Sequence, residues 1–276
     1  MSKNSPIRVA VDIGGTFTDL HLHDPGTGKT IEWKTPSTPE DPSVGLIKGL
    51  EEICTAAGLA PRQIGIILHG STIATNAVLE RKLPLGGLIT TRGFRDVLEV
   101  GRHIRSDVYT LKAEPRSLLI PRQHRFEVDE RITADGEIET PLNESQVERC
   151  IEDIVGRGLA TVAVMFLHGY RNPVHELRVA QIIRSLAPDL SVTTSFESSP
   201  EIREFERVST TVLNALLRPV ISGYLERVSS RLEAAGIPAA LYLVQSNGGL
   251  ATPADAAALP AKLLLSGPAG GAMAMA

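Results

Sequence analysis

The sequence predicts an α/β protein with two subdomains, and three observations lead to that prediction. Apolar, β-rich runs alternate with amphipathic helical stripes along the 276 residues. The first three runs are separated only by tight turns, which is typical of antiparallel strands. A later series of strands and helices, roughly residues 100–195, contains enough apolar residues for a core of its own.

The composition argues against nucleic-acid and membrane partners. Hydrophobic residues make up 42% of the chain and charged residues 22%, and the formal net charge is −4. Nucleic-acid binding favours an excess of positive charge, and crossing a bilayer needs about 20 consecutive apolar residues. The sequence has neither feature. The first residues are polar and lead directly into a strand rather than a signal peptide, so we expect a cytoplasmic protein.

The first two apolar runs meet at Gly14-Gly15 and predict a β-hairpin. The incoming run places Val9, Val11 and Ile13 at alternate positions, as one face of a strand requires. Because glycine has no Cβ, the backbone N–H groups of this turn can approach an anion closely. The alternative is that Gly-Gly makes a turn and nothing more.

Four oxygen-bearing side chains flank the turn and favour phosphate binding. Thr16 and Thr18 add hydroxyl groups, and Asp12 and Asp19 add carboxylates. Carboxylates suit Mg²⁺, which prefers oxygen ligands and keeps several of its waters. Phosphoryl transfer requires phosphate oxygens to be held and their charge neutralised by a metal. The stretch therefore predicts a site for phosphate and Mg²⁺.

The stretch from Asp12 to Asp19, Asp-Ile-Gly-Gly-Thr-Phe-Thr-Asp, resembles the first phosphate loop of the actin/Hsp70/sugar-kinase superfamily. Its Thr-Phe-Thr-Asp ending is similar to one branch, the ATP-dependent hydantoinase A/5-oxoprolinase family, which includes acetone-carboxylase-type subunits. The further stretches that agree with this branch, in family order, are His69–Ala77, Thr90–Asp96, Asp129–Arg131, Asn172–Glu176, Glu206–Thr211, Gln245–Gly249 and Ser266–Gly271.

The later elements each have a local signal. The expected strands after the hairpin are Thr30–Lys34, Ile64–Leu68, Leu85–Thr91, Arg125–Thr133, Ala160–Leu167, Ser191–Ser195, Ala239–Val244 and Lys262–Leu265. Asp41 followed by proline starts a helix that Gly58 ends, and Asn143 caps another. Pro219 is expected to break or kink the helical stretch between about 200 and 236, giving two segments.

The resemblance implies a ribonuclease-H-like first half with an inserted α/β subdomain. We expect residues 1–195 to form the hydantoinase A/oxoprolinase N-terminal region, with a ribonuclease-H-like core over 7–95 and the α/β insertion over 100–195. Residues 196–276 would then be the truncated start of the family's ATPase domain. No second Asp-x-Gly-Gly-Thr occurs in the chain, so we expect a fragment that lacks half of the ATP cleft and is inactive alone.

Two groups of polar residues are candidates for binding substrate. His69, Thr72 and Asn76 follow a predicted buried strand, and ligands gather at such strand ends. Ser246 and Asn247 lie in a glycine-rich loop after a later strand. The alternatives are structural: a hydroxyl that caps a helix, a histidine hydrogen-bonded in the core, and ordinary turn chemistry. Both interpretations remain open at this point.

The arginines at positions 92, 95, 102 and 105 also allow two interpretations. Arginine side chains can orient a carboxylate or a phosphate. A charged, solvated face is the simpler interpretation, and we prefer it here.

The resemblance implies an ATP-dependent hydrolase that phosphorylates the carbonyl oxygen of a cyclic amide, such as a hydantoin or 5-oxoproline, so that the ring can be hydrolysed. It implies catalytic roles for Asp12, Thr16 and Asp19, a metal role for Asp12, and phosphate binding by Gly14, Gly15, Thr16 and Thr18. The implied cofactors are ATP and Mg²⁺. The implied partner is a second subunit of the hydantoinase B type, within an oligomer.

Three other functions compete with this one. A ketone carboxylase subunit would activate its substrate by the same phosphorylation. A sugar-type kinase shares the glycine motif, but bacterial members commonly carry a cysteine-rich zinc motif, and this chain has only two cysteines. A non-enzymatic ATPase scaffold of the actin or chaperone type would hydrolyse ATP without depending on either a lactam or a ketone.

Overall fold

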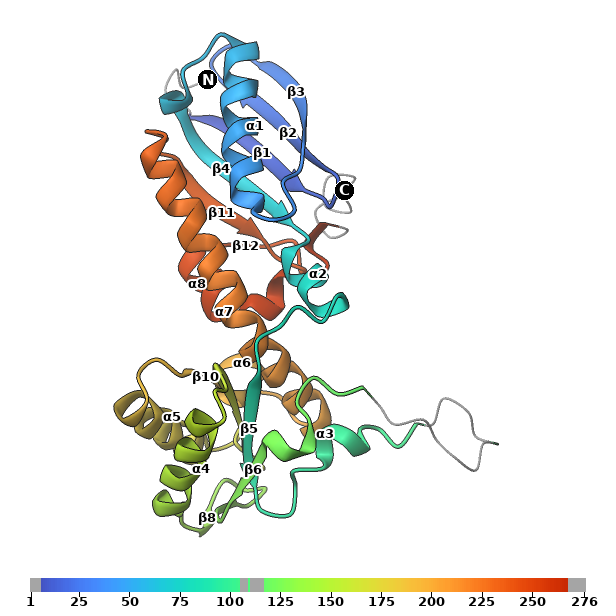
Figure 1. Ribbon diagram of the computed structural model, residues 1–276, viewed down its shortest axis with the longest axis vertical. Coiled ribbons are helices and arrows are strands. Elements are labelled where there is room, and N and C mark those ends of the chain that lie inside the picture. Colours follow the sequence, from blue (N-terminus) through green and yellow to red (C-terminus); the bar gives the residue numbers. More distant parts are fainter. Residues whose placement is uncertain (1–5, 105–108, 110–116, 268–276) are drawn as a thin grey trace. The chain divides into compact units, whose positions relative to one another are not determined.

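The computed structural model describes residues 6–104, 109 and 117–267, and these fall into two compact units (Figure 1). The first unit comprises residues 1–82 and 220–276, and the second comprises residues 83–219. The long helix α7, Glu204–Ala234, contributes to both, because the division falls at Pro219 within it. The helix is continuous through that proline, so the two separate segments predicted from the sequence are wrong.

The first unit is built on a six-stranded mixed sheet with the order β12-β11-β4-β1-β2-β3. Its strands are β1 (Ile7–Ile13), β2 (Phe17–Asp24), β3 (Lys29–Pro36), β4 (Ile64–Ser71), β11 (Ala240–Val244) and β12 (Leu250–Ala251). The first three are antiparallel, whereas β4 and β11 run parallel to β1. The hairpin and the third strand predicted from the sequence are therefore present.

Helix α1 (Pro42–Ala57) covers one face of this sheet. Asp41 caps it by accepting from the Ser43 backbone, and Gly58 ends it in the left-handed conformation, both as predicted. At Gly49 the helix approaches β2 so closely that a Cβ would lie 2.7 Å from a methyl carbon of Leu20. Burial of Val9, Val11 and Ile13 fixes which face of β1 points to α1, and leaves the intervening Asp12 on the other face.

The remaining elements of the first unit are short. They are η1 (Pro61–Gln63), α2 (Ile73–Leu79), α8 (Pro253–Ala258) and η3 (Pro260–Leu263). The predicted strand over 262–265 is wrong, because proline at position 260 starts a 3-10 turn there. The glycine loop predicted after it lies outside the described residues from position 268 onward.

The second unit has a four-stranded, fully parallel sheet with the order β10-β9-β5-β6. Its strands are β5 (Gly86–Thr91), β6 (Arg125–Val128), β9 (Thr161–Met165) and β10 (Ser191–Thr194), and a separate hairpin pairs β7 (Arg131–Ile132) with β8 (Ile138–Thr140). We expected 85–91 in the first core, and this is wrong: β5 pairs with β6 and β9 instead. Both neighbours are parallel, and β5 is buried along its whole length in the middle of the second sheet.

Helices cover both faces of this second sheet. Helices α4 (Glu144–Gly156) and α5 (Val174–Leu186) pack on one face around Ile89, Val162 and Val164. The first part of α7 and the short α3 (Val97–Val100) pack on the other face around Leu88, Ala163 and Met165. Alternate residues of one strand thus enter two separate cores, as a parallel sheet requires. The short η2 (Arg122–His124) and α6 (Ser195–Ser198) complete the unit.

Candidate functional site

The turn between β1 and β2 is closed by a backbone hydrogen bond from Gly14 N–H to the carbonyl of Phe17, 3.0 Å long. A Cβ on Gly14 would lie 3.1 Å from that same carbonyl oxygen, so the turn itself favours glycine at this position. Gly15 differs: a Cβ there would meet no atom within 4 Å. Gly15 and Thr16 are exposed at the tip. The fold therefore explains Gly14 but leaves Gly15 free to serve a ligand.

Thr18 supports the turn from below rather than facing a ligand. Its side chain is fully buried, and its hydroxyl lies 3.0 Å from the hydroxyl of Ser37. Ser37 in turn donates to the Gly14 carbonyl at 2.8 Å, and its backbone N–H donates to the Thr16 carbonyl at 2.9 Å. Sequence reasoning missed Ser37, because no local pattern links a residue after β3 to the first hairpin.

Asp12 and Asp19 stand opposite each other on the two strands of the hairpin, as direct register partners. Residues paired in this way share one face of a sheet. The pKa of the Asp12 carboxyl is raised above its ordinary value, first by desolvation and then by repulsion from Asp19. Asp19 is also paired with Lys34 at 3.0 Å. Two carboxylates that disfavour each other's charge fit a hydrated divalent cation, which would relieve the repulsion.

A cavity of about 320 Å³ lies beside the turn on the other face of the hairpin. Its walls include Gly14, Gly15, Thr72, Asn76 and Lys82. Asp12 does not line it, because Asp12 and Ile13 point to opposite faces of β1. The structure thus brings Thr72 and Asn76 to the glycine turn. It separates them from the carboxylate pair.

The polar groups of α2 are already tied to the turn. The Thr72 hydroxyl donates to the Ile13 carbonyl at 3.3 Å, and the side-chain amide of Asn76 donates to the Thr72 hydroxyl at 3.2 Å. Lys82, which the sequence did not single out, pairs with Glu80 at 2.7 Å, and both residues line the same cavity. A lysine three residues beyond a helix end gives no recognisable signal before the cavity is seen.

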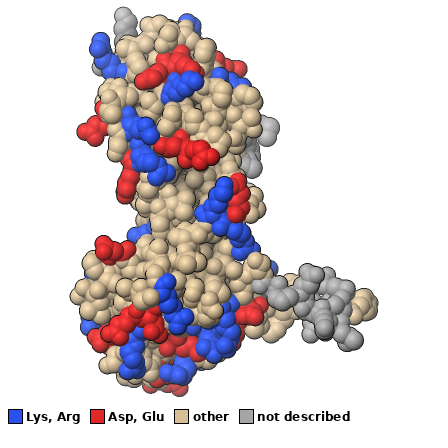
Figure 2. Space-filling view, in the orientation of Figure 1, with Lys and Arg blue, Asp and Glu red and all other residues tan. Residues whose placement is uncertain are grey.

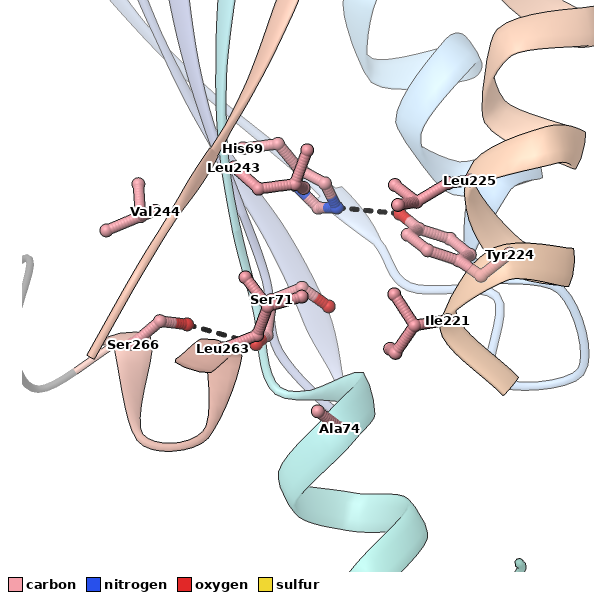
Figure 3. Close-up of a pocket in the computed structure, with 10 residues that line it drawn as sticks. All are labelled: His69, Ser71, Ala74, Ile221, Tyr224, Leu225, Leu243, Val244, Leu263 and Ser266. Atoms are coloured by element: carbon pink, nitrogen blue, oxygen red, sulfur yellow. Dashed lines mark hydrogen bonds between the residues drawn. The ribbon is translucent and has the colours of Figure 1, made fainter. Parts of the chain in front are cut away.

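His69 is buried in the core of the first unit rather than placed in this cavity. Its Nε2 lies 2.7 Å from the hydroxyl of Tyr224 on α7, as Figure 3 shows. Burial lowers the pKa of His69 from 6.5 to about 4, and a backbone hydrogen bond at Val11 offsets part of the shift. The ring is therefore neutral at physiological pH. Beside it, the Ser266 hydroxyl donates to the Ser71 carbonyl at 3.3 Å (Figure 3).

Ser246 and Asn247 are exposed in the turn between β11 and β12. The Asn247 side chain accepts a hydrogen bond from the Gly249 backbone at 2.9 Å, and the Ser246 backbone donates to the Lys262 carbonyl at 2.7 Å. Neither residue lines the cavity beside the glycine turn. Turn chemistry accounts for the contacts they make.

The arginines that follow β5 are paired with acids of the second unit. Arg92 contacts Asp129 through two nitrogens, Arg95 lies 3.4 Å from Glu127, and Arg102 contacts Glu206 at 2.5 Å. The fourth arginine, at position 105, lies outside the described residues. On the face shown in Figure 2, blue and red side chains are interspersed within each unit.

Two further features bear on what can bind. Within residues 6–104, 109 and 117–267, no three His, Cys, Asp or Glu side chains gather closely enough to hold a metal ion by themselves. A magnesium ion at Asp12 and Asp19 would therefore depend on waters and phosphate oxygens for its other ligands. In the same described part of the chain, no helix has the length and apolarity needed to cross a membrane.

Known proteins resemble this chain along nearly its whole length. An uncharacterized protein of Methanocaldococcus jannaschii is 42% identical over 272 residues, which cover 98% of this chain and 39% of that protein. The caprolactamase subunit alpha of Pseudomonas jessenii is 37% identical over 257 residues, which cover 91% of this chain and 37% of that subunit. The chain thus spans about two fifths of the length of these relatives.

Two solved structures share the fold. The crystal structure of the ATP-dependent caprolactamase from Pseudomonas jessenii matches with a TM-score of 0.83 and 34% identity, over 95% of this chain and 39% of that one. The nucleotide-free structure of acetone carboxylase matches with a TM-score of 0.85 and 25% identity, over 97% of this chain and 40% of that one.

Family descriptions match both parts of the sequence. Residues 8–187 match the hydantoinase/oxoprolinase N-terminal region, and residues 207–276 match hydantoinase/oxoprolinase. These matches, together with a relative 42% identical over 98% of the chain, agree with the motifs that run from the glycine turn to the last loop. The chain belongs to the hydantoinase/oxoprolinase family.

Proposed function

We propose that this chain is the ATP-binding part of an enzyme that phosphorylates the carbonyl oxygen of a cyclic amide, such as a hydantoin or 5-oxoproline. Phosphorylation removes the resonance that makes an amide resistant to water, and ring-opening hydrolysis then becomes possible. One related enzyme is described as an ATP-dependent caprolactamase, and caprolactam is a cyclic amide. Hydrolysis of the activated ring would take place on a partner subunit of the hydantoinase B type within an oligomer.

The observation that carries the proposal is the hairpin turn with its two paired carboxylates. Gly15 and Thr16 are exposed, and the fold gives no reason for glycine at position 15. A phosphate oxygen approaching the backbone there would supply that reason. Asp12 and Asp19 already disfavour each other's charge, which fits a cation between them and the phosphates.

Each residue of the turn has a distinct task in this proposal. Asp12, with Asp19, would hold Mg²⁺ and orient its waters, and the backbone of Gly14 and Gly15 with the Thr16 hydroxyl would hold phosphate. Bound MgATP supplies the transferable phosphoryl group and neutralises its charge. Thr18 would act indirectly, because its hydroxyl bonds to Ser37 and not to the open turn.

Substrate would bind beside the turn. Thr72 and Asn76 line the cavity next to Gly15, and the amide N–H of Asn76 that is not bonded to Thr72 would donate to a ring carbonyl. His69 would help by holding β4 against α7, because its ring is buried against Tyr224. Ser246 and Asn247 remain candidates from the sequence only.

We extend the proposal to the fold and the domains. The order β3-β2-β1-β4-β11, with three antiparallel strands followed by two parallel ones, supports a ribonuclease-H-like first unit. In that interpretation the second unit is an α/β insertion. The bounds predicted from sequence, 1–195 and 196–276, stay predictions.

A second candidate function is activation of a ketone for carboxylation. It is favoured by the match to acetone carboxylase, whose TM-score of 0.85 is as high as that of the caprolactamase. The two functions share the phosphate turn and would differ in the substrate that stimulates release of phosphate. ATP turnover that needs neither substrate would point instead to an ATPase scaffold.

Phosphate release by the assembled enzyme, chain and partner subunit together, tests the proposal. With Mg²⁺ and ATP, we expect a lactam panel to stimulate release and a ketone panel with bicarbonate to have no effect. Asp12→Asn should abolish the stimulation while circular dichroism shows an intact fold. Near-normal turnover by a folded Asp12→Asn enzyme would refute the metal role. Thr16→Ala should cost less, because one hydrogen bond to a charged group contributes about 1.5–3 kcal/mol.

A further inference from the structure

A cavity of about 670 Å³ opens in the second unit, away from every residue assigned above. Its walls come from segments that follow three adjacent parallel strands. Gly93 and Phe94 follow β5, Arg131 follows β6, and Leu167 and His168 follow β9. The fourth wall is the start of α7, with Arg203 just before it.

The position of this cavity in the sheet is one where ligands bind. β6, the next strand of this sheet along the chain, pairs with one edge of β5. The following strand, β9, pairs with the opposite edge of β5, so the strand order reverses between β5 and β9. In open parallel sheets, ligands bind at the carboxyl ends of the strands where the order reverses. Residues after β5 and residues after β9 face this cavity from the two sides of that point.

Strained backbone gathers around the same cavity. The described residues include five non-glycine residues with positive φ, and three of them, His103, His168 and Arg203, line it. Their φ angles are 57°, 55° and 80°. Residues other than glycine rarely adopt this backbone conformation. Where the surrounding structure holds them in it, they cluster at binding sites.

A buried polar network fixes the strained turn at His168. Glu176 is fully buried and accepts hydrogen bonds from the Phe166 backbone at 2.9 Å and from Arg207 at 3.3 Å. The Leu167 backbone donates to the Thr91 hydroxyl at 3.1 Å. The two residues that precede His168 are thus held by side chains from α5 and β5.

The same network reaches the segment after β6. Glu130 is buried, and one of its carboxylate oxygens lies 2.8 Å from Nδ1 of His175. The Thr91 hydroxyl donates a hydrogen bond to the other carboxylate oxygen. Arg131 follows directly and stacks 5.3 Å from the ring of Phe94. Four of the stretches that identify the family therefore converge on this cavity or on the network behind it, namely Thr90–Asp96, Asp129–Arg131, Asn172–Glu176 and Glu206–Thr211.

The lining suits a small organic acid. Arg102 is paired with Glu206 and Asp96 with Arg122, so these charges are balanced within the protein. Of the other charged groups, Arg131 has a long ion pair, to Glu139 at 3.9 Å, beside its contact with the Phe94 ring. Arg203 and Glu204 complete the charged rim, and His168 adds a ring nitrogen. The apolar part of the wall is formed by Phe94, Val97, Val100, Leu167 and Phe205.

We propose that this cavity binds a small carboxylate, with Arg203 and Arg131 holding the carboxylate and the apolar wall holding its carbon skeleton. The site goes beyond the function proposed above, because it lies in the second unit and requires no nucleotide. The strained backbone at Arg203 and His168 would place the guanidinium and the imidazole where the ligand needs them.

The test uses the ¹⁵N-labelled chain without ATP and two matched pairs of probes. 5-Oxoproline is compared with 2-pyrrolidinone, the same ring without the carboxylate, and benzoate is compared with benzamide. At millimolar concentrations we expect at least one acid to shift the amide signals of Gly93, Phe94 and His168, and its neutral partner to have no such effect. Equal shifts from acid and neutral probes, shifts confined to the first unit, or no shift from either acid would overturn the proposal.

Arg203→Gly is the decisive variant, because glycine adopts positive φ without strain. We expect unchanged or higher thermal stability and at least a tenfold loss of carboxylate affinity, as the loss of a charged hydrogen bond predicts. Arg131→Gln should weaken binding in the same direction. Arg62→Gln, at an exposed arginine of the first unit, is the matched control and should change nothing. Unaltered affinity in a folded Arg203→Gly protein would refute the role of Arg203. Loss of MgATP binding at Gly14–Thr16 would be a separate result that bears only on the proposed function.

Discussion

The two sheets of this protein offer ligands different kinds of surface. The mixed sheet of the first unit presents a hairpin turn whose tip is exposed and whose carboxylates stand side by side. The parallel sheet of the second unit is covered on both faces, and only its strand ends are open. The first surface can be recognised from consecutive residues. The second is assembled from segments far apart in sequence and becomes visible only when the chain is folded.

The two units also hold buried charge differently. In the second unit Glu176 accepts four hydrogen bonds, from Phe166, Ser195, Phe196 and Arg207, although burial raises the pKa of its carboxyl. In the first unit His69 is buried as well, but it is kept neutral. Because the pKa of the Glu176 carboxyl is raised and that of the His69 imidazole is lowered, these two groups should make stability depend on pH in opposite directions.

The largest effect is expected from Glu176→Gln. The substitution leaves Arg207 buried without its counter-ion, and breaking such a pair costs about 3–5 kcal/mol in the free energy of unfolding. Urea unfolding followed by far-UV circular dichroism measures this loss. Glu144→Gln is the matched control, because Glu144 pairs with Arg178 at 2.8 Å on the exposed surface and its loss should leave the midpoint unchanged. Equal effects from the two variants would show that burial does not distinguish the pairs.

The next effect is the pH dependence that His69 gives to the first unit. Its folded pKa of about 4 lies below the ordinary 6.5, so the unfolded chain binds the extra proton. Stability is therefore complete above about pH 6.5 and falls by about 3 kcal/mol as the pH drops toward 4. Fluorescence of Trp33, the one tryptophan, follows unfolding of this unit in urea at each pH. His69→Gln should remove this part of the dependence, and a variant with the same slope as the parent would contradict the assignment.

The sequence allowed much of the first unit to be predicted. The alternation of Val9, Val11 and Ile13, the Asp41 cap and the Gly58 stop are local signals, and each appears as expected. The placement of β5 could not be predicted, because an apolar run fits a central strand of either sheet and only its neighbours decide. The strand predicted at 262–265 failed because proline at 260 favoured a turn.

The candidate site was predicted in part for the same reason. The glycine turn and its carboxylates are consecutive in sequence, whereas Ser37, Lys82 and Tyr224 reach their places through tertiary contacts. Thr18 was expected to face phosphate. It alternates with the buried Leu20 and Leu22 on one face of β2, which directs it inward, toward Ser37. The alternation of the strand predicts that inward orientation. The family motif instead led us to assign Thr18 to phosphate.

The smallest changes in stability are expected from substitutions at two glycines of the first unit. These two substitutions also distinguish a glycine needed for packing from one proposed to serve ligand binding. Gly49→Ala should destabilise by about 1–3 kcal/mol, because its Cβ would lie 2.7 Å from Leu20 in a packed interface. Gly15→Ala should leave stability unchanged or raise it by about 0.4–1 kcal/mol, since its Cβ meets nothing and the unfolded chain loses freedom.

The same two variants separate folding from binding when MgATP is added to the enzyme assembled with its partner subunit. Gly49→Ala should retain nucleotide affinity at temperatures where it is folded, because Gly49 lies on α1 and packs against Leu20. Gly15→Ala should bind MgATP more weakly although it is fully folded, because the added methyl occupies the space where a phosphate would meet the backbone. Calorimetry measures both affinities. If Gly15→Ala bound MgATP as tightly as the parent, the glycine would be a turn residue alone, and the phosphate site would have to be sought elsewhere.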